Sequence, residues 1–384
     1  MPPRTLIPAI LGFAALACSL AGAAETTVIY KSKYRIINIH RHCTQARQEF
    51  VRAELAAEDL AGVSAFVNLD VGSRELNLKE WVELRKKFGG RLILFFMLDA
   101  RNSARPTFFD DAVRDLAYAA SQGVQGVKVW KDLGMYARDH AGKLIAADDP
   151  RLDPFWRKCG ELKLPVLMHT ADEEEYWRPL TYNSYHYGTR QESDQHYRNS
   201  EIPKWDELIR QRDAVLERHP HTNFIGAHMG SQSLHLDQLG QTLERRPNFH
   251  VETAGRLRIL GRLNPQAVRD FFVKYEDRIL FGTDDLVLMK SVKPRNTANF
   301  TVYPRDDSIW ELVDPADAEG VERWQRRAAE NYSQYLQYFE TERLDLYDPN
   351  HFATTWLRIP GIHLPDKTLE KLYYGNAARL IPGL

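Results

Sequence analysis

Cysteine is scarce in this sequence, and neither sign of charge is in excess. The 384 residues include three cysteines and carry a formal net charge of −1, with acidic and basic residues interleaved along the chain. Such a balance argues against the strongly basic surface of proteins that bind nucleic acid or an anionic membrane, so neither partner is expected. Beyond residue 23 only Cys43 and Cys159 remain. They are too few for a disulfide framework and lack the spacing of a thiolate metal site, so we expect buried free thiols.

A glycine-rich turn between a strand and a helix, of the kind that binds nucleotides, is also missing, which weakens the case for an open doubly wound sheet. Short apolar runs alternate instead with stretches of helical periodicity, which predicts βα units around a parallel sheet. The eight runs are Arg35–His40, Ser64–Asn68, Leu92–Leu98, Gly126–Trp130, Pro165–His169, Asn223–Ala227, Phe249–Glu252 and Ile279–Thr283. They favour a closed (β/α)₈ barrel, a TIM barrel, over residues 34–384, with helices at Gln45–Ala57, Leu78–Phe88 and Asp110–Ser121 among others.

The N-terminal residues have the composition of an export signal. Arg4 supplies a positive charge, the apolar run Leu6–Leu20 follows, and Ala21–Ala24 offers small residues for cleavage. Because the run is short for a membrane span, residues 1–23 are predicted to be a signal peptide and the mature protein to be periplasmic or secreted. The alternatives are an N-terminal membrane anchor and, ranked lower, a lipoprotein modified at Cys18, which lacks the usual leucine three places before it.

Two stretches exceed what a minimal barrel needs. Residues 171–218, between the fifth and sixth runs, are rich in tyrosine and tryptophan, and the chain continues well beyond the eighth run to a helical segment near Leu369–Leu380. Loops that follow barrel strands form the functional face of this fold. The first stretch is therefore a candidate lid, with an ordinary insertion on the barrel rim as the alternative, and the second is a C-terminal helical extension.

Polar residues stand at the ends of four otherwise apolar runs. His40 and His42 are two residues apart on one strand and should point the same way, while His169, His228 and Asp284 follow three other strands. The carboxyl ends of barrel strands converge on one mouth, where active sites of this fold lie. Each residue alone could be a hydrogen-bonded structural group. Agreement across four strands predicts a metal site, because imidazole and carboxylate are ligands for zinc and related ions.

The ordered motifs INIHRH, PVLMHTAD, FIGAHMG and ILFGTDD resemble the amidohydrolase superfamily, specifically its branch of amidohydrolase-related hydrolases and decarboxylases, and the closing YYGNAARL is similar to the segment that commonly ends such chains. The resemblance implies that His40, His42, His169 and Asp284 bind one divalent metal ion. It also implies that Asp284 shuttles a proton and that His228 binds or polarises the reacting group. Zinc is the default for this ligand set, and manganese, iron and cobalt accept the same ligands.

Basic residues near the strand ends are candidates for substrate binding. Lys128 points into the barrel if Val127 and Val129 face the surrounding helices, and two-metal branches of the superfamily carry a bridging carboxylated lysine or a glutamate on this strand. A second metal bridged by Lys128 is therefore the alternative to an ion-paired or substrate-contacting lysine. Other charged groups that follow strand ends are Lys131, Asp172, Glu252, Arg256 and Arg262. Arg256 is preferred for a carboxylate because a guanidinium can donate two parallel hydrogen bonds, and Lys131 is a second candidate.

The leading hypothesis is an exported metal-dependent hydrolase that cleaves a C–N or C–O bond of a small amide, lactone or ester through a metal-activated water. Asp284 would move the proton, and His228 would stabilise the developing oxyanion. The runner-up is non-oxidative decarboxylation or hydration of a carboxylic acid, which the same branch performs with the same ligands. A third hypothesis is a binding protein that kept the barrel and lost catalysis. The expected partner is a small molecule, carboxylate-bearing in the second hypothesis, and a homo-oligomer is compatible with the sequence.

Overall fold

The computed structural model describes residues 28–179, 181, 197, 201–291, 295–296, 301–302, 310–347 and 358–384. The predicted signal peptide, residues 1–23, and with it Cys18, lies outside the described residues. Within the described part of the chain, no helix is both long and apolar enough to cross a membrane.

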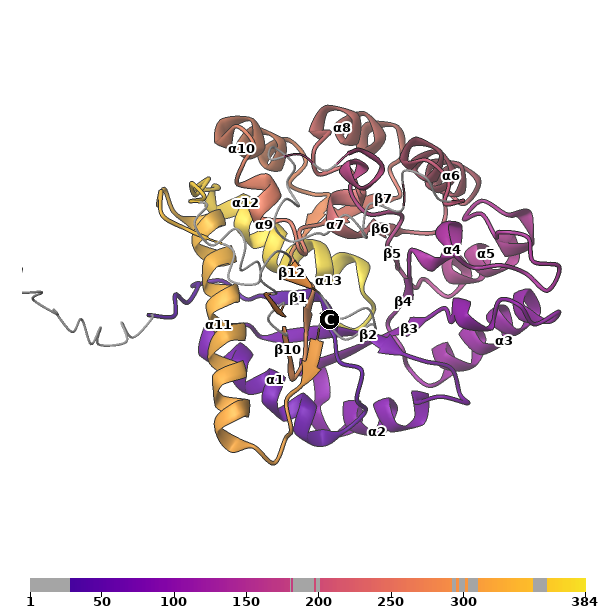
Figure 1. Cartoon of the computed structure of the whole chain (residues 1–384), viewed down its shortest axis with the longest axis horizontal. Helices are drawn as coiled ribbons and strands as arrows, with labels where there is room; N and C mark the ends of the chain where they lie inside the picture. The colour runs from indigo at the N-terminus through magenta and orange to yellow at the C-terminus, as the bar shows by residue number, and fades with distance from the viewer. Residues whose placement is uncertain are drawn as a thin grey trace, which may run out of the picture.

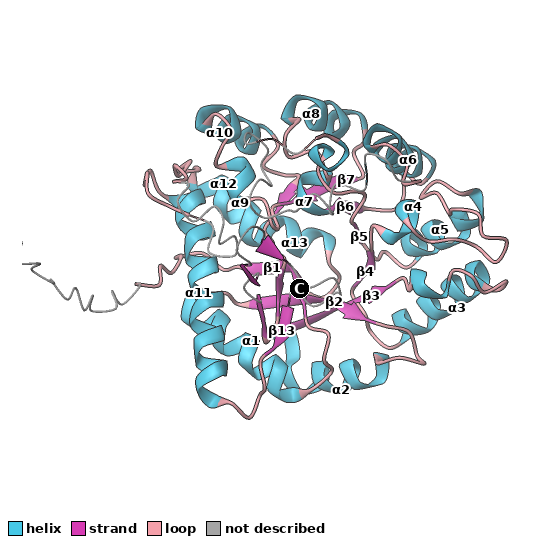
Figure 2. Cartoon of the chain, viewed as in Figure 1, coloured by secondary structure: helices cyan, strands magenta, loops and turns pink. Residues whose placement is uncertain are grey.

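Eight parallel strands form the wall of a barrel, one at each apolar run predicted from the sequence (Figures 1 and 2). They are β1 (Ile37–His42), β2 (Ala65–Val71), β3 (Leu92–Met97), β4 (Gly126–Val129), β5 (Val166–Met168), β6 (Phe224–Gly226), β7 (Phe249–Glu252) and β8 (Ile279–Leu280). Each strand pairs with the next one along the chain. Helices cover one face of each strand and the barrel interior covers the other, which explains why the runs are continuously apolar.

The barrel closes where the chain after β8 meets β1. The N–H of Ile39 donates to the carbonyl of Phe281 at 3.0 Å, and the N–H of Asp284 donates to the carbonyl of His40 at 2.9 Å. The short strand β9 (Asp285–Leu286) then pairs in parallel with β1, with Arg41 opposite Asp285. These bonds complete the ring and confirm the predicted (β/α)₈ barrel.

Helices surround the ring and continue beyond it (Figures 1 and 2). Those between strands are α1 (Gln48–Ala61), α2 (Leu78–Phe88), α3 (Phe108–Ser121), α4 (Asp132–Met135), α5 (Asp153–Glu161), α6 (Trp205–Arg218), α7 (Ala227–Gly230), α8 (Leu236–Arg245), α9 (Leu257–Leu260) and α10 (Pro265–Lys274). The first helix was predicted to begin three residues too early, at Gln45, and to end before Ala61, at Ala57. Residues 43–47 instead form a loop, in which the backbone N–H of Cys43 donates to the Asn68 side chain. The last part of the predicted 171–218 insertion is α6, a regular barrel helix.

The C-terminal extension is helical, as predicted. It contains α11 (Ala318–Glu340), which packs along α1, and then α12 (Asp366–Glu370), a π-helical turn (Lys371–Gly375) and α13 (Asn376–Leu380). Short antiparallel pairs precede α11: β10 (Met289–Ser291) with β13 (Trp310–Leu312), and β11 (Arg295–Asn296) with β12 (Thr301–Val302). In Figure 1, α13 lies over the centre of the ring, and Ala377 and Leu380 belong to the interior apolar cluster. The extension therefore closes one end of the barrel.

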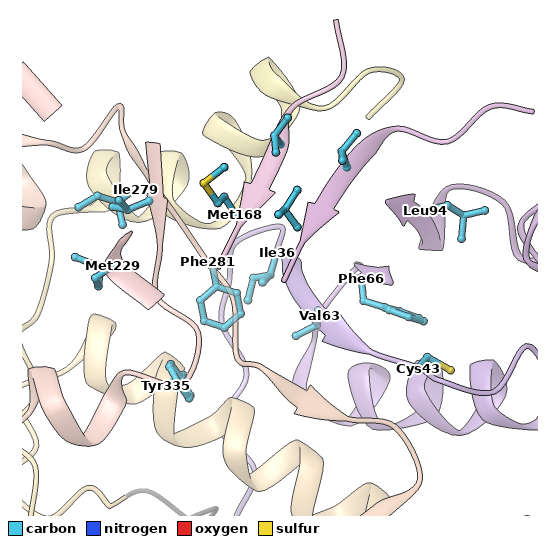
Figure 3. Close-up of a cluster of buried hydrophobic side chains, with 14 of the residues drawn as sticks. Ile36, Cys43, Val63, Phe66, Leu94, Met168, Met229, Ile279, Phe281 and Tyr335 are labelled. Atoms are coloured by element: carbon cyan, nitrogen blue, oxygen red, sulfur yellow. The ribbon is translucent and has the colours of Figure 1, made fainter. Parts of the chain in front are cut away.

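Alternate side chains of the strands enter two different apolar clusters. The outer cluster lies between the strands and the helices and includes Phe66, Phe281 and Tyr335 (Figure 3). The inner cluster fills the barrel with Ile37, Ile39, Val67, Phe95, Leu167 and Ile225, among others. Val127 and Val129 belong to the outer cluster. Because side chains alternate along a strand, Lys128 between them points into the barrel, as predicted.

Gly126 is required by the packing of the barrel interior. A Cβ atom at this position would lie 2.4 Å from two carbon atoms of the Phe95 ring, which occupies the space that a side chain would fill. We expect Gly126→Ala to lower the free energy of unfolding by about 1–3 kcal/mol, the usual range for overpacking. Gly90→Ala is the matched control, because no atom lies within 4 Å of its added Cβ. Urea denaturation followed by circular dichroism compares the two variants, and equal stabilities would contradict this account of the interior.

Candidate metal centre

Three side chains from the segments that close the barrel converge at its mouth. The Nε2 atoms of His40 and His42 are 3.3 Å apart, and Asp284 Oδ1 lies 3.2 Å from the first and 3.3 Å from the second. The histidines end β1, and Asp284 stands between β8 and β9. Three of the four predicted metal ligands thus present their donor atoms to one point, in an almost equilateral triangle that we call the ligand triangle.

The ligand triangle has the dimensions of one face of a tetrahedral zinc site. Bonds of about 2.0–2.1 Å in tetrahedral geometry hold neighbouring ligand atoms about 3.3 Å apart. The observed edges of 3.2–3.3 Å agree with this value. Two imidazoles and a carboxylate are also donors that divalent zinc, manganese, iron and cobalt accept. The residues present therefore fit a divalent metal ion.

Each histidine of the triangle is oriented by a buried carboxylate on its far side. His42 Nδ1 lies 3.1 Å from Asp70 Oδ1, and His40 Nδ1 lies 3.0 Å from Glu252 Oε1. When Nδ1–H donates to a carboxylate, a neutral ring presents its lone pair on Nε2, the atom that faces the triangle. Burial lowers the pKa of His42, but Asp70 and Asp284 more than offset it and raise the pKa to about 9, so this ring must give up a proton when it binds an ion. Burial raises the pKa of the Glu252 carboxyl, but the neighbouring His40 and His228 more than offset it and lower the pKa to about 2. Glu252 is therefore a fixed negative charge.

Asp284 is the most accessible member of the triangle. Its side chain is 31% exposed, against 1% for His40 and 4% for His42. Burial raises the pKa of Asp284, yet the two imidazoles hold it well below its usual range, so the carboxylate is ionised. The backbone φ of 61° is left-handed, a conformation that aspartate tolerates better than most residues. Oδ1 faces the histidines, which leaves Oδ2 available for another partner.

His228 is held beside Asp284 by its backbone and its ring. Its φ is 59°, its N–H donates to Glu252 Oε1 at 2.7 Å, and its Nδ1 bonds the carbonyl oxygen of Ala254 at 2.8 Å. Because a carbonyl only accepts, Nδ1 carries the proton. Burial and the charge of Arg256 keep the pKa of His228 well below its usual value, so the ring is neutral. Nε2, 3.7 Å from Asp284 Oδ2, then has a free lone pair and can donate to an oxyanion only after taking up a proton.

His169 lies beside these groups but outside the ligand triangle. Its ring meets that of His228 edge to face, with centroids 4.5 Å apart. Its buried Nε2 makes no hydrogen bond with any residue that the structure describes, and Asp172 Oδ1 is 3.8 Å away. Burial, together with the charges of Lys131 and Lys128, holds the pKa of His169 well below its usual value. A buried polar atom without a partner is costly unless it has a ligand, and a neutral imidazole lone pair of this kind is what a metal requires.

Lys128 reaches the same point from the barrel interior. It is fully buried, and its Nζ lies 3.4 Å from His40 Nε2 and 5.1 Å from the centroid of the Trp130 ring, which also packs on His42. Burial lowers the pKa of the Lys128 amine to about 8 against the opposing effect of Asp284 and other carboxylates. The amine therefore loses its proton more readily than an exposed lysine, which suits a position beside metal ligands.

The two other predicted substrate-binding residues are held in ion pairs at the rim. Lys131 Nζ lies 2.6 Å from Asp172 Oδ2, and Arg256 Nε lies 2.5 Å from Glu173 Oε1. Asp172 and Glu173 follow β5 closely, at the base of the predicted lid. A substrate carboxylate would have to compete with these carboxylates for either cation.

Sequence reasoning missed Asp70 and misread Glu252. The second apolar run was expected to end at Asn68, but β2 continues to Val71, and Asp70 follows Asn68 at the two-residue spacing that singled out the histidine pair. That spacing was the available signal. Glu252 was expected to lie near an anionic substrate, whereas it is fully buried and bonds His40.

Comparison with known proteins agrees with this architecture. A sequence profile described as amidohydrolase matches residues 38–383. No curated protein matches the chain. An uncharacterised TIM-barrel protein from Bordetella bronchiseptica has a similar structure, with a TM-score of 0.50 and 15% identity over 90% of this chain and 98% of that one.

Other solved structures are more distant. A 2,6-dihydroxybenzoate decarboxylase from Rhizobium has a TM-score of 0.43 and 17% identity over 65% of this chain and 88% of its own. A probable 2-pyrone-4,6-dicarboxylic acid hydrolase from Acinetobacter baumannii also has a TM-score of 0.43, with 12% identity over 90% and 98%. The profile covers nearly the whole barrel and spans the predicted ligand residues. The chain therefore belongs to the amidohydrolase family, whose members are metal-dependent enzymes.

Proposed function

We propose that this protein is an exported metal-dependent hydrolase that cleaves a C–N or C–O bond of a small amide, lactone or ester. The observation that carries the proposal is the ligand triangle of His40, His42 and Asp284, in which the two histidines are buried and the carboxylate is accessible. His169, whose buried Nε2 makes no hydrogen bond within the described part of the chain, is the proposed fourth ligand. Zinc is the proposed metal because it is the default for three imidazoles and a carboxylate, and the edges of the triangle are compatible with it.

The proposed mechanism divides the work between the two oxygens of Asp284. A bound divalent ion supplies Lewis acidity, which lowers the pKa of water towards ~7. Asp284 Oδ1 holds the triangle, and Oδ2 accepts the proton of the attacking water and passes it to the leaving group. His228 Nε2 lies on the Oδ2 side, where it can accept a hydrogen bond from water or substrate and, once protonated, stabilise an oxyanion.

Decarboxylation or hydration of a carboxylic acid is the second candidate, and Lys128 favours it. This buried amine beside His40 forms no ion pair with a carboxylate among the described residues, in contrast to Lys131 and Arg256. It could therefore bind a substrate carboxylate directly. Because no such ion pair holds the amine, Lys128 could also be carboxylated and bridge a second metal ion, which is the less favoured alternative. Catalytic inactivity is least favoured, because both the ligands and the proton-handling carboxylate are present.

Metal removal and product analysis test the proposal. Purified mature protein should contain about one equivalent of zinc, lose activity after dialysis against a chelator, and regain it when zinc returns. The assay is a panel of amides, lactones, esters and aromatic carboxylic acids, with both hydrolysis products and carbon dioxide measured. Carbon dioxide release without hydrolysis would replace the first candidate with the second. Two equivalents of metal would support a bridging Lys128, and a folded protein that binds no metal would refute the proposal.

A further inference from the structure

Arg41, the residue between the two histidines of β1, sends its guanidinium to the opposite side of the barrel wall. The side chain is fully buried. Nη2 lies 2.5 Å from Glu54 Oε2 on α1, and Nη1 lies 2.9 Å from Asp285 Oδ2 on β9. One arginine thus joins a strand of the barrel, the helix that covers it and the strand that closes the ring.

The position of this ion pair coincides with the seam that carries the ligand triangle. Arg41 and Asp285 are paired directly across β1 and β9. Backbone hydrogen bonds on either side run from Asp284 N–H to the His40 carbonyl and from Val287 N–H to the His42 carbonyl, at 2.9 and 2.8 Å. All three ligand atoms of the triangle therefore lie on the two segments that the Arg41–Asp285 pair connects.

Helix α11 of the C-terminal extension completes the network. Asn331 Nδ2 donates to Asp285 Oδ2, and the Tyr332 hydroxyl donates to Glu54 Oε1 at 3.0 Å. The guanidinium carbon of Arg41 also lies 5.5 Å from the centroid of the Tyr332 ring. Both acidic partners of the arginine are thereby fixed by a helix that a minimal barrel does not possess.

Stability alone is a poor reason for such a network. Buried ion pairs cost desolvation, and apolar residues of similar volume often replace them without loss of stability. A buried arginine with several partners does something else: its planar guanidinium fixes the relative positions of the groups that it joins. Here those groups lie on the segments that bring Asp284 to His40 and His42.

We propose that Arg41, supported by Asn331 and Tyr332 of α11, is a positioning residue that holds the ligand triangle in register from outside the barrel. This inference rests on the proposed metal site. It assigns a role in metal affinity to the C-terminal extension, although neither α11 residue belongs to the ligand triangle.

Zinc affinity separates positioning from simple structural support. Competition with a chromophoric chelator measures the zinc dissociation constant of the mature protein and of Arg41→Lys, which keeps the charge but loses the planar fork. Removal of a group that bonds a metal ligand directly typically weakens binding 10–100-fold. Arg41 acts through Asp285 and the backbone of β1 rather than by bonding a ligand, so we expect a loss of about tenfold, at the lower end of that range. The melting temperature of each metal-free protein is measured by circular dichroism as a record of folding.

The matched control is Arg278→Lys. Arg278 is a partly buried arginine that also joins neighbouring segments of the barrel, but it bonds the carbonyls of Phe249 and Arg246 at the ends of the strands away from the triangle, at 2.9 and 2.6 Å. Its variant should lower the melting temperature without changing the zinc dissociation constant. If Arg41→Lys does not fold, Tyr332→Phe, which removes a single hydroxyl, takes its place and should weaken zinc binding in the same direction.

Three results would overturn the inference, and they can be told apart. Zinc binding by wild type with an unchanged dissociation constant in the folded Arg41 or Tyr332 variant would refute the positioning role alone. A wild-type protein that binds no zinc, manganese, iron or cobalt would refute the proposed metal site and the positioning role with it. An equal loss of zinc affinity in Arg278→Lys would show a general effect of destabilisation and would also refute the positioning role.

Discussion

Replacement of both β1 histidines, His40→Ala with His42→Ala, is expected to abolish metal binding and to lower kcat/KM by roughly 10³-fold or more. The two imidazoles supply two corners of the ligand triangle, 3.3 Å apart, and the remaining Asp284 and His169 cannot hold an ion with comparable affinity. Lewis acidity contributes several kcal/mol to transition-state stabilisation, and each 1.36 kcal/mol corresponds to a tenfold change in rate. Elemental analysis and steady-state kinetics on the substrate identified by the panel measure both effects.

His219→Ala is the matched control for this experiment. His219 is also buried and bonded to a carboxylate, Asp153 Oδ1 at 3.0 Å, but it lies in the loop that precedes β6, at the end of the strands away from the triangle. It should retain the full metal content. A double variant of His40 and His42 that keeps its zinc would show that the ion binds elsewhere and would refute the assignment of the triangle.

The barrel was predictable because its strands are buried on both faces. Segments such as Leu92–Met97 and Phe224–Gly226 are apolar throughout, so they do not show the alternating polar and apolar faces of a surface helix. Their regular alternation with helical segments indicates parallel strands. The bounds of the elements were less accurate. Loop residues 43–47 have acceptable helix formers among them, so the sequence pattern does not mark where the helix begins, and in the structure the backbone of Cys43 is bonded to the Asn68 side chain.

The candidate ligand residues were predictable for a related reason, since polar residues that end four different buried strands are hard to explain as four separate structural groups. His40, His42 and Asp284 come together as expected. What the sequence could not show is which groups face each other across the barrel. The bond between Glu252 and His40 joins residues 212 positions apart, and the ion pairs of Lys131 and Arg256 depend on the path of the chain after β5.

Arg41 illustrates the same limit on the outer face of the barrel. Strand alternation predicts that it points away from its two histidine neighbours. Its partners on α1, β9 and α11 come from segments that only the closure of the ring and the course of the C-terminal extension bring together. The candidate metal centre is thus predicted by local pattern, while the groups that orient its proposed ligands are set by tertiary structure.

Asp284→Asn is expected to lower kcat by about 10²–10⁴-fold, the usual contribution of a general acid–base group. The amide keeps an oxygen that can face His40 and His42, so part of the metal affinity should survive, but the nitrogen that replaces one carboxylate oxygen cannot take up a proton. Because the side chain is accessible and the change preserves its shape, the variant should fold. Kinetics at saturating zinc separate the loss of proton transfer from any loss of metal.

Asp70→Asn gives the contrasting result that makes the assignment of Asp284 specific. Among the described residues, the Asp70 side chain bonds only the outer nitrogen of His42, so its replacement should weaken zinc binding 10–100-fold while kcat at saturating zinc stays close to wild type. Asp284→Asn should show the reverse, a low kcat that excess zinc does not restore. If saturating zinc restores both variants equally, Asp284 acts as a ligand alone and the proton must pass through another group. His228 is the chemical alternative on this side of the triangle, because its Nε2 has a free lone pair and lies 3.7 Å from Asp284 Oδ2.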